Sequence, residues 1–218
     1  MTAIADTRRV LVTCTRSTVS VPTALVSLLF GAFALAQPPS DPVVVFDGTD
    51  LAGFVFDGEA NWHVVGDVVE ATEGNGYLVV KDPYADFVLT LEFWVASSVN
   101  SGVYLRCPAP DEHGGRICYE VQIHDYRPNQ IYRTGGIVRH RSPAEHVNSV
   151  GQWNSYEIRA EGERITVTLN DVVTAEIENN DYVCEQPCAH RSDGYIALQY
   201  NDDSGGVLKF RNIRIQPL

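Results

Sequence analysis

The stretch Tyr119-Glu120-Val121-Gln122-Ile123-His124-Asp125 alternates apolar and polar residues, and this period of two decides the class of fold. Successive side chains of a β-strand point to opposite faces, so the apolar residues share one face and pack into a core. The polar residues share the other face: Glu120, Gln122 and His124. The stretch therefore predicts a strand with one buried face and one face open to solvent or to a ligand.

Two other runs alternate in the same way and add polar side chains to the same predicted face. From Gly102 to Arg106 the outward residues are Tyr104 and Arg106, and from Tyr195 to Tyr200 they include Gln199. If the three strands are neighbours, they form one polar wall that suits a sugar, because amides and carboxylates bind hydroxyl groups and an aromatic ring covers a pyranose. The alternative is a sheet face that simply meets water.

The rest of the chain also consists of short β-rich runs separated by turns, without an amphipathic helix of more than about two turns. The other predicted strands are Val43–Phe46, Trp62–Val65, Asp67–Ala71, Tyr77–Val80, Phe87–Val95, Trp153–Ala160, Arg164–Asn170, Val172–Ile177 and Val207–Ile215. Many short strands with turn signals predict an all-β sandwich or jelly roll of two antiparallel sheets. Pro108–Arg116 and Asp125–Pro143 are predicted loops, and long loops in compact β domains often carry function.

The N-terminal residues have the pattern of an export signal. Arg8, Arg9 and Arg16 precede the apolar run 19–36, which ends in the small residues of Ala34-Leu35-Ala36. The alternative is a membrane anchor, because a run of about 18 apolar residues approaches the length that spans a bilayer. We therefore expect a signal peptide at 1–36, a linker at 37–42, one domain at 43–218, and an exported protein, either periplasmic or secreted.

The charge of the chain limits its partners. The formal net charge is −12, and loss of the arginine-rich leader makes the remainder more acidic. Such a surface repels nucleic acid and anionic membranes, whereas it tolerates neutral ligands. We therefore expect a small-molecule or oligosaccharide substrate, no nucleic acid and, after cleavage of the signal, no membrane.

Four cysteines follow the predicted signal: Cys107, Cys118, Cys184 and Cys188. An even number in an exported chain indicates two disulfides, for which three pairings exist. We favour Cys107–Cys118, which would clamp a loop between two strands, and Cys184–Cys188, which would close a short loop. The alternative is a zinc site, but the spacings C-x10-C and C-x3-C fit the familiar metal patterns poorly.

Short motifs in a fixed order run through nearly the whole predicted domain. They are Val45–Phe54, Trp62 with Val64, Tyr84–Phe87, Leu91–Phe93, Asn100–Arg106, Tyr119–Asp125, Thr134–Ile137, Gly151–Asn154, Ile196–Gln199 and Phe210–Arg214. In this order and spacing the chain resembles the domain of unknown function 1080 family, described as 3-keto-disaccharide hydrolases or 3-keto-glucoside lyase/hydratases. The resemblance implies a jelly roll of the concanavalin A-like lectin/glucanase superfamily with its site on the concave sheet.

The resemblance also implies chemistry on a sugar that is already oxidised at C3. The 3-ketone acidifies the C2 proton, a general base removes that proton, and an enolate forms. The C1 oxygen substituent then leaves, and water adds across the resulting double bond to complete a net hydrolysis. Such a site needs a base, a cationic or metal group for the enolate oxygen, and an acid for the leaving group.

These roles find candidates on or near the predicted polar face. The base is Glu120 or His124, each of which has a workable pKa when it is partly buried. Arg106 can stabilise the enolate oxygen because its charge is permanent. His140 or Tyr104 can supply the proton to the leaving group.

Other polar residues are candidates for binding. The hydroxyl groups of the sugar would be held by Asn100, Gln122 and Gln199. Asp125 could bind a divalent metal ion together with Glu120 or His124, or it could only start a turn after the strand. Beyond that possible metal ion, no cofactor is expected. Arg139 and Arg141 either edge the site or are solvated.

Two other functions fit the same predicted fold. A conventional glycosidase needs two carboxylates at the scissile bond, and this strand offers only Glu120, so that Glu92 or another residue would have to supply the second. A lectin-like module needs no catalysis, but Glu, His and Arg on one face exceed what sugar binding requires.

Trp62 could stack on a sugar ring, although a place in the core is the commoner fate of tryptophan.

Overall fold

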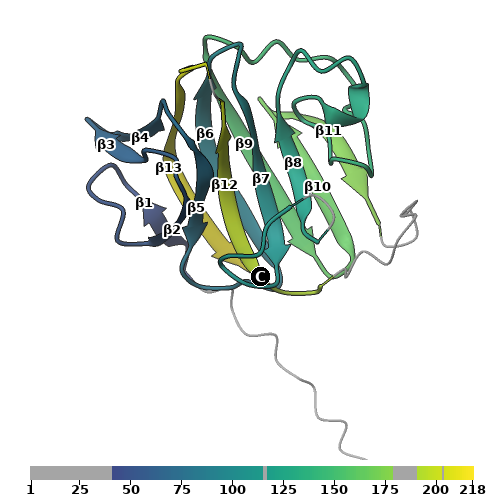
Figure 1. Cartoon of the computed structure of the whole chain (residues 1–218). Helices are drawn as coiled ribbons and strands as arrows, with labels where there is room; N and C mark the ends of the chain where they lie inside the picture. Colours follow the sequence, from purple (N-terminus) through teal and green to yellow (C-terminus); the bar gives the residue numbers. More distant parts are fainter. Residues whose placement is uncertain (1–40, 115–116, 179–190, 203) are drawn as a thin grey trace, which may run out of the picture. The chain divides into compact units, whose positions relative to one another are not determined.

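The computed structural model describes residues 41–114, 117–178, 191–202 and 204–218, which belong to one compact unit of the chain. Its regular elements are β-strands and one short 3₁₀ helix (Figure 1). They are β1 Val43–Phe46, β2 Phe54–Gly58, β3 His63–Val65, β4 Val68–Ala71, β5 Asn75–Val80, β6 Phe87–Val95, β7 Asn100–Cys107, β8 Tyr119–Ile123, η1 Gln130–Tyr132, β9 Trp153–Glu161, β10 Arg164–Leu169, β11 Val172–Ile177, β12 Tyr195–Asn201 and β13 Leu208–Pro217. The predicted signal peptide lies outside the described residues. Within them, no helix has the length and apolar character needed to cross a bilayer.

The strands form two antiparallel sheets, as the sequence predicts. One sheet has eight strands in the order β11-β10-β9-β6-β13-β4-β3, with β1 also paired to β13. The other has five strands in the order β2-β5-β12-β7-β8, so the three strands with polar faces are indeed neighbours. Pairing of strands far apart in the sequence, such as β5 with β12, gives the chain a jelly-roll sandwich and not a row of hairpins.

Apolar side chains fill the space between the sheets. In β6 every second residue is buried: Phe87, Leu89, Leu91, Phe93 and Val95. The apolar residues of β8 join the same core, which confirms the predicted alternation of this strand. Trp62 packs against Tyr200 and Phe210 with ring centroids 6.2 and 6.3 Å apart, so the expected core position of this tryptophan is confirmed.

A chain segment beyond the sheet extends the edge of β8. The backbone N–H of Gly135 donates to Gln122, and that of Val138 donates to Glu120. Ile137 pairs with Val121 and is fully buried. The long predicted loop after β8 is therefore anchored along the strand that carries the candidate site.

Candidate active site

Polar residues of adjacent strands meet on the outer face of the five-stranded sheet. Tyr104 of β7 lies directly opposite Glu120 of β8, and Gly102 lies between Gln122 of β8 and Gln199 of β12. A Cβ atom added to Gly102 would come within 3.0 Å of a carboxylate oxygen of Glu120. This glycine therefore leaves room for the carboxyl group and for a ligand between the two amides.

Glu120 is a buried carboxyl group with only 7% of its surface exposed. Burial raises the pKa of Glu120 to about 7, although a hydrogen bond from Tyr104 and the positive charges of Arg139 and Arg127 act in the opposite direction. Burial also raises the pKa of Tyr104, so this phenol stays protonated and donates to the carboxylate. A carboxyl group that is half ionised near neutral pH is suited to remove a proton from a substrate.

Gln199 connects two tyrosines across the middle of the sheet. Its Nε2 atom lies 3.2 Å from the hydroxyl of Tyr77 and 3.2 Å from the hydroxyl of Tyr104. The two rings also meet edge to face, with centroids 5.4 Å apart. The amide oxygen of Gln199 is buried and has no partner among the described residues, which leaves it free to accept from a ligand hydroxyl.

A hollow of about 180 Å³ opens beside Gln199 toward β2. It is lined by Asp57, Gly58, Asn75, Gly76, Tyr77, Gln199, Tyr200 and Asn201. Asn100 of β7 lies opposite Asn201, and its amide oxygen is also buried without a partner in the described part of the chain. Carboxylate and amide groups around a small hollow suit the hydroxyl groups of a sugar.

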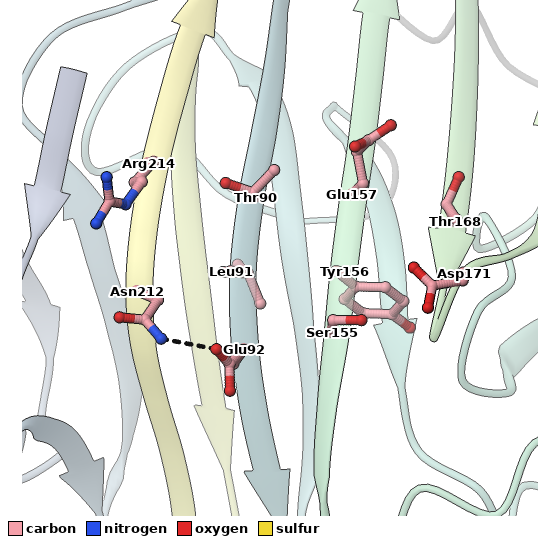
Figure 2. Close-up of a pocket in the computed structure, with 10 residues that line it drawn as sticks. All are labelled: Thr90, Leu91, Glu92, Ser155, Tyr156, Glu157, Thr168, Asp171, Asn212 and Arg214. Atoms are coloured by element: carbon pink, nitrogen blue, oxygen red, sulfur yellow. Dashed lines mark hydrogen bonds between the residues drawn. The ribbon is translucent and has the colours of Figure 1, made fainter. Parts of the chain in front are cut away.

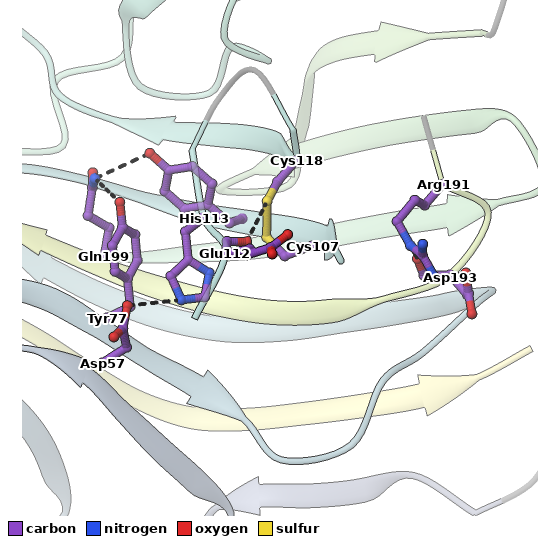
Figure 3. Close-up of a disulfide and its surroundings, with 10 residues drawn as sticks. Asp57, Tyr77, Cys107, Glu112, His113, Cys118, Arg191, Asp193 and Gln199 are labelled. Carbon is purple, nitrogen blue, oxygen red and sulfur yellow. Dashed lines mark hydrogen bonds and ion pairs between the residues drawn. A yellow bond between two sulfur atoms is a disulfide. The ribbon is translucent and has the colours of Figure 1, made fainter. Parts of the chain in front are cut away.

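His113 and Asp57 belong to the same face, although the sequence pattern did not indicate them. Nε2 of His113 lies 3.4 Å from a carboxylate oxygen of Asp57, and its ring centroid lies 4.3 Å from that of Tyr77 (Figure 3). Burial lowers the pKa of His113, so the imidazole is neutral at neutral pH. Asp57 was missed because β2 was not predicted, and His113 because its loop shows no regular pattern.

The predicted disulfide Cys107–Cys118 is confirmed and closes the loop that carries His113 (Figure 3). Both cysteines pack with Tyr104, Val79 and Ala197 in a small apolar cluster on the outer face of the sheet. The bond thus fixes one end of that loop beside the candidate site. The second predicted pair, Cys184–Cys188, lies outside the described residues.

The arginines that follow β8 differ in what they do. The charges of Arg127 and Arg139 both act on Glu120, whereas the guanidinium of Arg141 donates to the backbone oxygen of Glu176. His124 comes directly after the strand, and its Nδ1 atom is buried without a partner among the residues described. Burial lowers the pKa of His124, and the charge of Arg127 lowers it further, so this imidazole is also neutral.

The prediction that Arg106 lies on this face is wrong. The register between β7 and β12 shifts between Tyr195 and Ala197, which leaves one extra residue in β7, and Arg106 adopts a φ of 56°. Such a bulge reverses the alternation of side chains. As a result, Cys107 and not Arg106 packs beside Tyr104.

Arg106 instead joins the β7 end to loops of the other sheet. Its guanidinium is 2% exposed and donates to the backbone oxygens of Ala85 and Gly162 and to the carboxylate of Asp86. Since all these partners lie away from Glu120, this cation does not stabilise an enolate at the candidate site.

His140 is not placed with Glu120 either. Its ring centroid lies 5.5 Å from that of Tyr119, whose side chain belongs to the core between the sheets. Tyr119 and Glu120 are consecutive in a strand, so their side chains point to opposite faces. The predicted role of His140 as the acid for the leaving group is therefore incorrect for this geometry.

The proposed metal ligand Asp125 has a structural role. Its carboxylate accepts hydrogen bonds from the hydroxyl of Thr134, from the hydroxyl and N–H of Ser149, and from the N–H of Val150. These donors occupy the lone pairs that a metal ion would need. Within the described ranges, no three His, Cys, Asp or Glu side chains gather as metal ligands, so the residues do not fit a metal site.

Glu92 cannot supply a second catalytic carboxylate to this face. It lies on the outer face of the eight-stranded sheet, where Arg211 and Asn212 donate to it, both at 2.7 Å. Burial opposes ionisation of Glu92, but these donors lower its pKa overall. A hollow of about 290 Å³ on that side is lined by Glu92 and by Thr90, Leu91, Ser155, Tyr156, Glu157, Thr168, Asp171, Asn212 and Arg214 (Figure 2).

Comparison with known proteins assigns the chain to a family. The sequence model of the 3-keto-alpha-glucoside-1,2-lyase-like domain matches residues 41–216. The chain belongs to this family. No curated protein matches the chain. The family assignment confirms the part of the resemblance that concerns 3-keto-disaccharide hydrolases and places the protein among carbohydrate-active domains.

Solved structures agree with this assignment. A "putative glycosyl hydrolase" from Parabacteroides distasonis is 25% identical, with a TM-score of 0.72, over 82% of this chain and 100% of that chain. A second protein of the same name and organism is 27% identical, with a TM-score of 0.62, over 82% of this chain and 84% of that chain. The laminarinase of Rhodothermus marinus is 10% identical, with a TM-score of 0.57, over 82% of this chain and 96% of that chain, and shares the fold alone.

Proposed function

We propose that this member of the family cleaves 3-keto-glycosides by removal of the C2 proton, elimination of the C1 substituent and addition of water. The observation that carries the proposal is Glu120, whose pKa is raised to about 7 beside the hydroxyl of Tyr104. A carbon acid next to a ketone needs a base of this strength that is partly freed from water. The family assignment supports the substrate class.

The residues of the outer face divide the steps between them. Ionised Glu120 takes the C2 proton, and the electron pair moves into an enolate with its negative charge on the C3 oxygen. Arg127 and Arg139, whose charges already act on Glu120, favour this negative charge. Tyr104 passes the proton held by Glu120 to the leaving C1 oxygen as the C1–O bond breaks.

The second stage returns the site to its starting state. The enone keeps a double bond between C1 and C2, to which water adds its hydroxyl at C1 and a proton at C2. The amides of Gln122 and Gln199, on either side of Gly102, hold the sugar hydroxyl groups during both stages. The net result is hydrolysis of the glycosidic bond without an oxidant or a reductant.

A conventional glycosidase mechanism fits this face less well. In conventional glycosidases the two catalytic carboxyl groups lie about 5 to 10 Å apart. On the strands of this sheet, the other carboxylate on the outer face is Asp57 of β2, and three strands separate β2 from β8. At about 4.8 Å per strand spacing, the separation along the sheet is roughly 19 Å.

The test compares Glu120→Gln with the wild type on a 3-keto-glucoside and on the corresponding plain glucoside. We expect the wild type to turn over only the 3-keto compound, and the variant to lose at least about 10³-fold in kcat while it keeps its fold. Glu161→Gln is the matched control, because Glu161 is exposed and pairs with Arg159. Unchanged turnover by Glu120→Gln would remove Glu120 from the mechanism.

The same assay separates the two rival functions. Turnover of the plain glucoside would support a conventional glycosidase, and affinity for either sugar without turnover would support a binding module. We also propose that the protein is exported, which the disulfide Cys107–Cys118 supports, since such bonds persist in oxidising compartments. Detection of the N-terminus after Ala36 in the periplasmic or secreted protein would test this proposal.

A further inference from the structure

His113 is a buried ionisable side chain on the outer face of the five-stranded sheet. The proposed mechanism does not use it. Its side chain is 2% exposed and contacts both the carboxylate of Asp57 and the ring of Tyr77 (Figure 3). The proposed steps assign His113 no contact with the substrate. Its influence on the site must therefore pass through the groups that it contacts.

Those groups lead to Glu120 by two routes. Tyr77 touches the ring of Tyr104 directly, edge to face. Tyr77 also shares the amide of Gln199 with Tyr104, at 3.2 Å on each side. Tyr104 in turn donates to Glu120. A shift of Tyr77 would therefore move the phenol that holds the carboxylate in place.

The disulfide constrains the loop that carries His113. Cys107 ends β7, Cys118 directly precedes β8, and the bond between them closes the loop that carries His113. Both sulfur-bearing residues pack on the outer face beside Tyr104. The loop is thus covalently attached beside Tyr104, the residue that His113 contacts indirectly through Tyr77.

We propose that His113 is a positioning residue for Glu120, held against Tyr77 by the disulfide Cys107–Cys118, so that full activity requires the oxidised protein. This inference rests on the proposed function for its activity readout. It adds that a buried ring, which packs on Tyr77 of β5, sets the geometry of the base on β8.

The electrostatic surroundings predict the direction of the effect. Glu120 faces the hydroxyl of Tyr104 and the charges of Arg127 and Arg139, while Gln122 and His124 follow on its own strand. Each of the first three lowers the pKa of Glu120 against the effect of burial. Loss of the hydrogen bond from Tyr104 therefore raises that pKa further. The groups around His113 are Asp57, Tyr77 and Asp111.

The experiment measures the carboxyl pKa of Glu120 by ¹³C NMR, together with the pH profile of kcat/KM. For His113→Ala we expect both the pKa and the acid limb of the profile to rise by roughly half a unit to one unit. Activity at pH 6 should then fall about three- to tenfold. His113→Phe keeps a ring on Tyr77 and should restore the wild-type values, whereas the exposed control His146→Ala should change nothing.

The double variant Cys107→Ser/Cys118→Ser tests the role of the disulfide and should shift Glu120 as His113→Ala does. If this variant does not fold by circular dichroism, the alanine and phenylalanine variants still decide about His113. An unshifted pKa in His113→Ala, or an equal shift in His113→Phe, would overturn the inference. If the wild type has no activity on 3-keto-glycosides, the proposed function fails, but the NMR titration still tests the coupling.

Discussion

Glu120, the proposed base, also affects the stability of the fold. Its pKa in the folded protein is about 7, above its ordinary value of 4.5, because burial disfavours the ionised form. A group with a raised pKa contributes its full stability below the unfolded pKa and loses that contribution as the pH rises through the folded pKa. The window of this loss therefore runs from about pH 4.5 to about pH 7. The ionised form, which the proposed mechanism requires, therefore destabilises the fold.

Replacement of Glu120 by Gln should therefore stabilise the protein more at high pH than at low pH. Since one pKa unit corresponds to about 1.36 kcal/mol, the effect of Glu120→Gln on the free energy of unfolding should be about 2 to 3 kcal/mol more favourable at pH 9 than at pH 5. Urea denaturation at both pH values measures this difference. The exposed control Glu161→Gln should show no such dependence, and equal effects of Glu120→Gln at pH 5 and pH 9 would contradict the raised pKa.

Arg106 is predicted to matter for folding and not for the chemical step. Arg106→Ala removes a buried cation and leaves the backbone oxygens of Ala85 and Gly162 without their donor. We expect a loss of about 3 to 5 kcal/mol in the free energy of unfolding. In the folded fraction at low temperature, kcat should change less than about threefold. Arg159→Ala, at an exposed ion pair, is the control for stability. A large fall in kcat with unchanged stability would restore Arg106 to the catalytic site.

At the scale of the secondary-structure element, the sequence predicts well those strands in which apolar and polar residues alternate regularly. β6 and β11 were predicted with the bounds that the structure shows, and the two faces of β8 were assigned correctly. The bulge in β7 was not predicted, because it lies at the end of the strand and too few residues follow it to reveal the change in alternation. β2 was missed because its Phe54-Val55-Phe56 run carries exposed apolar residues and no alternation.

The candidate site was predictable to the extent that it lies on regular strands. Tyr104, Glu120, Gln122 and Gln199 were found because strand geometry alone brings them to one face. Arg106 and His140 were misplaced because a bulge and a loop set their directions. His113 could not be found, since only tertiary contacts to Asp57 and Tyr77 give it a place.

Gly102, where β7 pairs with β8 and β12, leads to a prediction about kcat. In Gly102→Ala the new methyl group would lie 3.0 Å from a carboxylate oxygen of Glu120 and 3.1 Å from its Cγ atom, so this side chain must shift. We expect kcat to fall about tenfold or more, with a loss of only about 1 to 2 kcal/mol in stability. The measurement is kcat together with the free energy of unfolding.

A matched control for this prediction is Gly66→Ala. Gly66 has a φ of 65°, which disfavours alanine, but no atom lies within 4 Å of the added Cβ. It should therefore lose a similar free energy of unfolding and keep its kcat. A fall in kcat of the same size in both variants would attribute the effect to stability and not to Glu120.

At the scale of the whole molecule, one hydroxyl group connects the two sheets behind the candidate site. Tyr156 of β9 lies in the eight-stranded sheet and packs on Phe93. Its hydroxyl donates to the backbone oxygen of Gln122 at 2.7 Å and accepts from the N–H of Gly135 at 2.8 Å. The strand that carries Glu120 is thus fixed from the core side as well as along its edge.

Removal of the Tyr156 hydroxyl should loosen the edge of the five-stranded sheet at β8 without disturbing the core. Tyr156→Phe keeps the ring but leaves the N–H of Gly135 and the backbone oxygen of Gln122 with only the 3.2 Å hydrogen bond between them, at a cost of about 1 kcal/mol. Because the loss falls on the segment beside β8, hydrogen exchange at Gly135 should accelerate more than exchange in β6. Urea denaturation and exchange measured by NMR check both effects, with Tyr126→Phe as a control at an exposed tyrosine. Uniform acceleration across both sheets would mean that the hydroxyl only adds global stability, and that the sheet edge is held by its own hydrogen bonds.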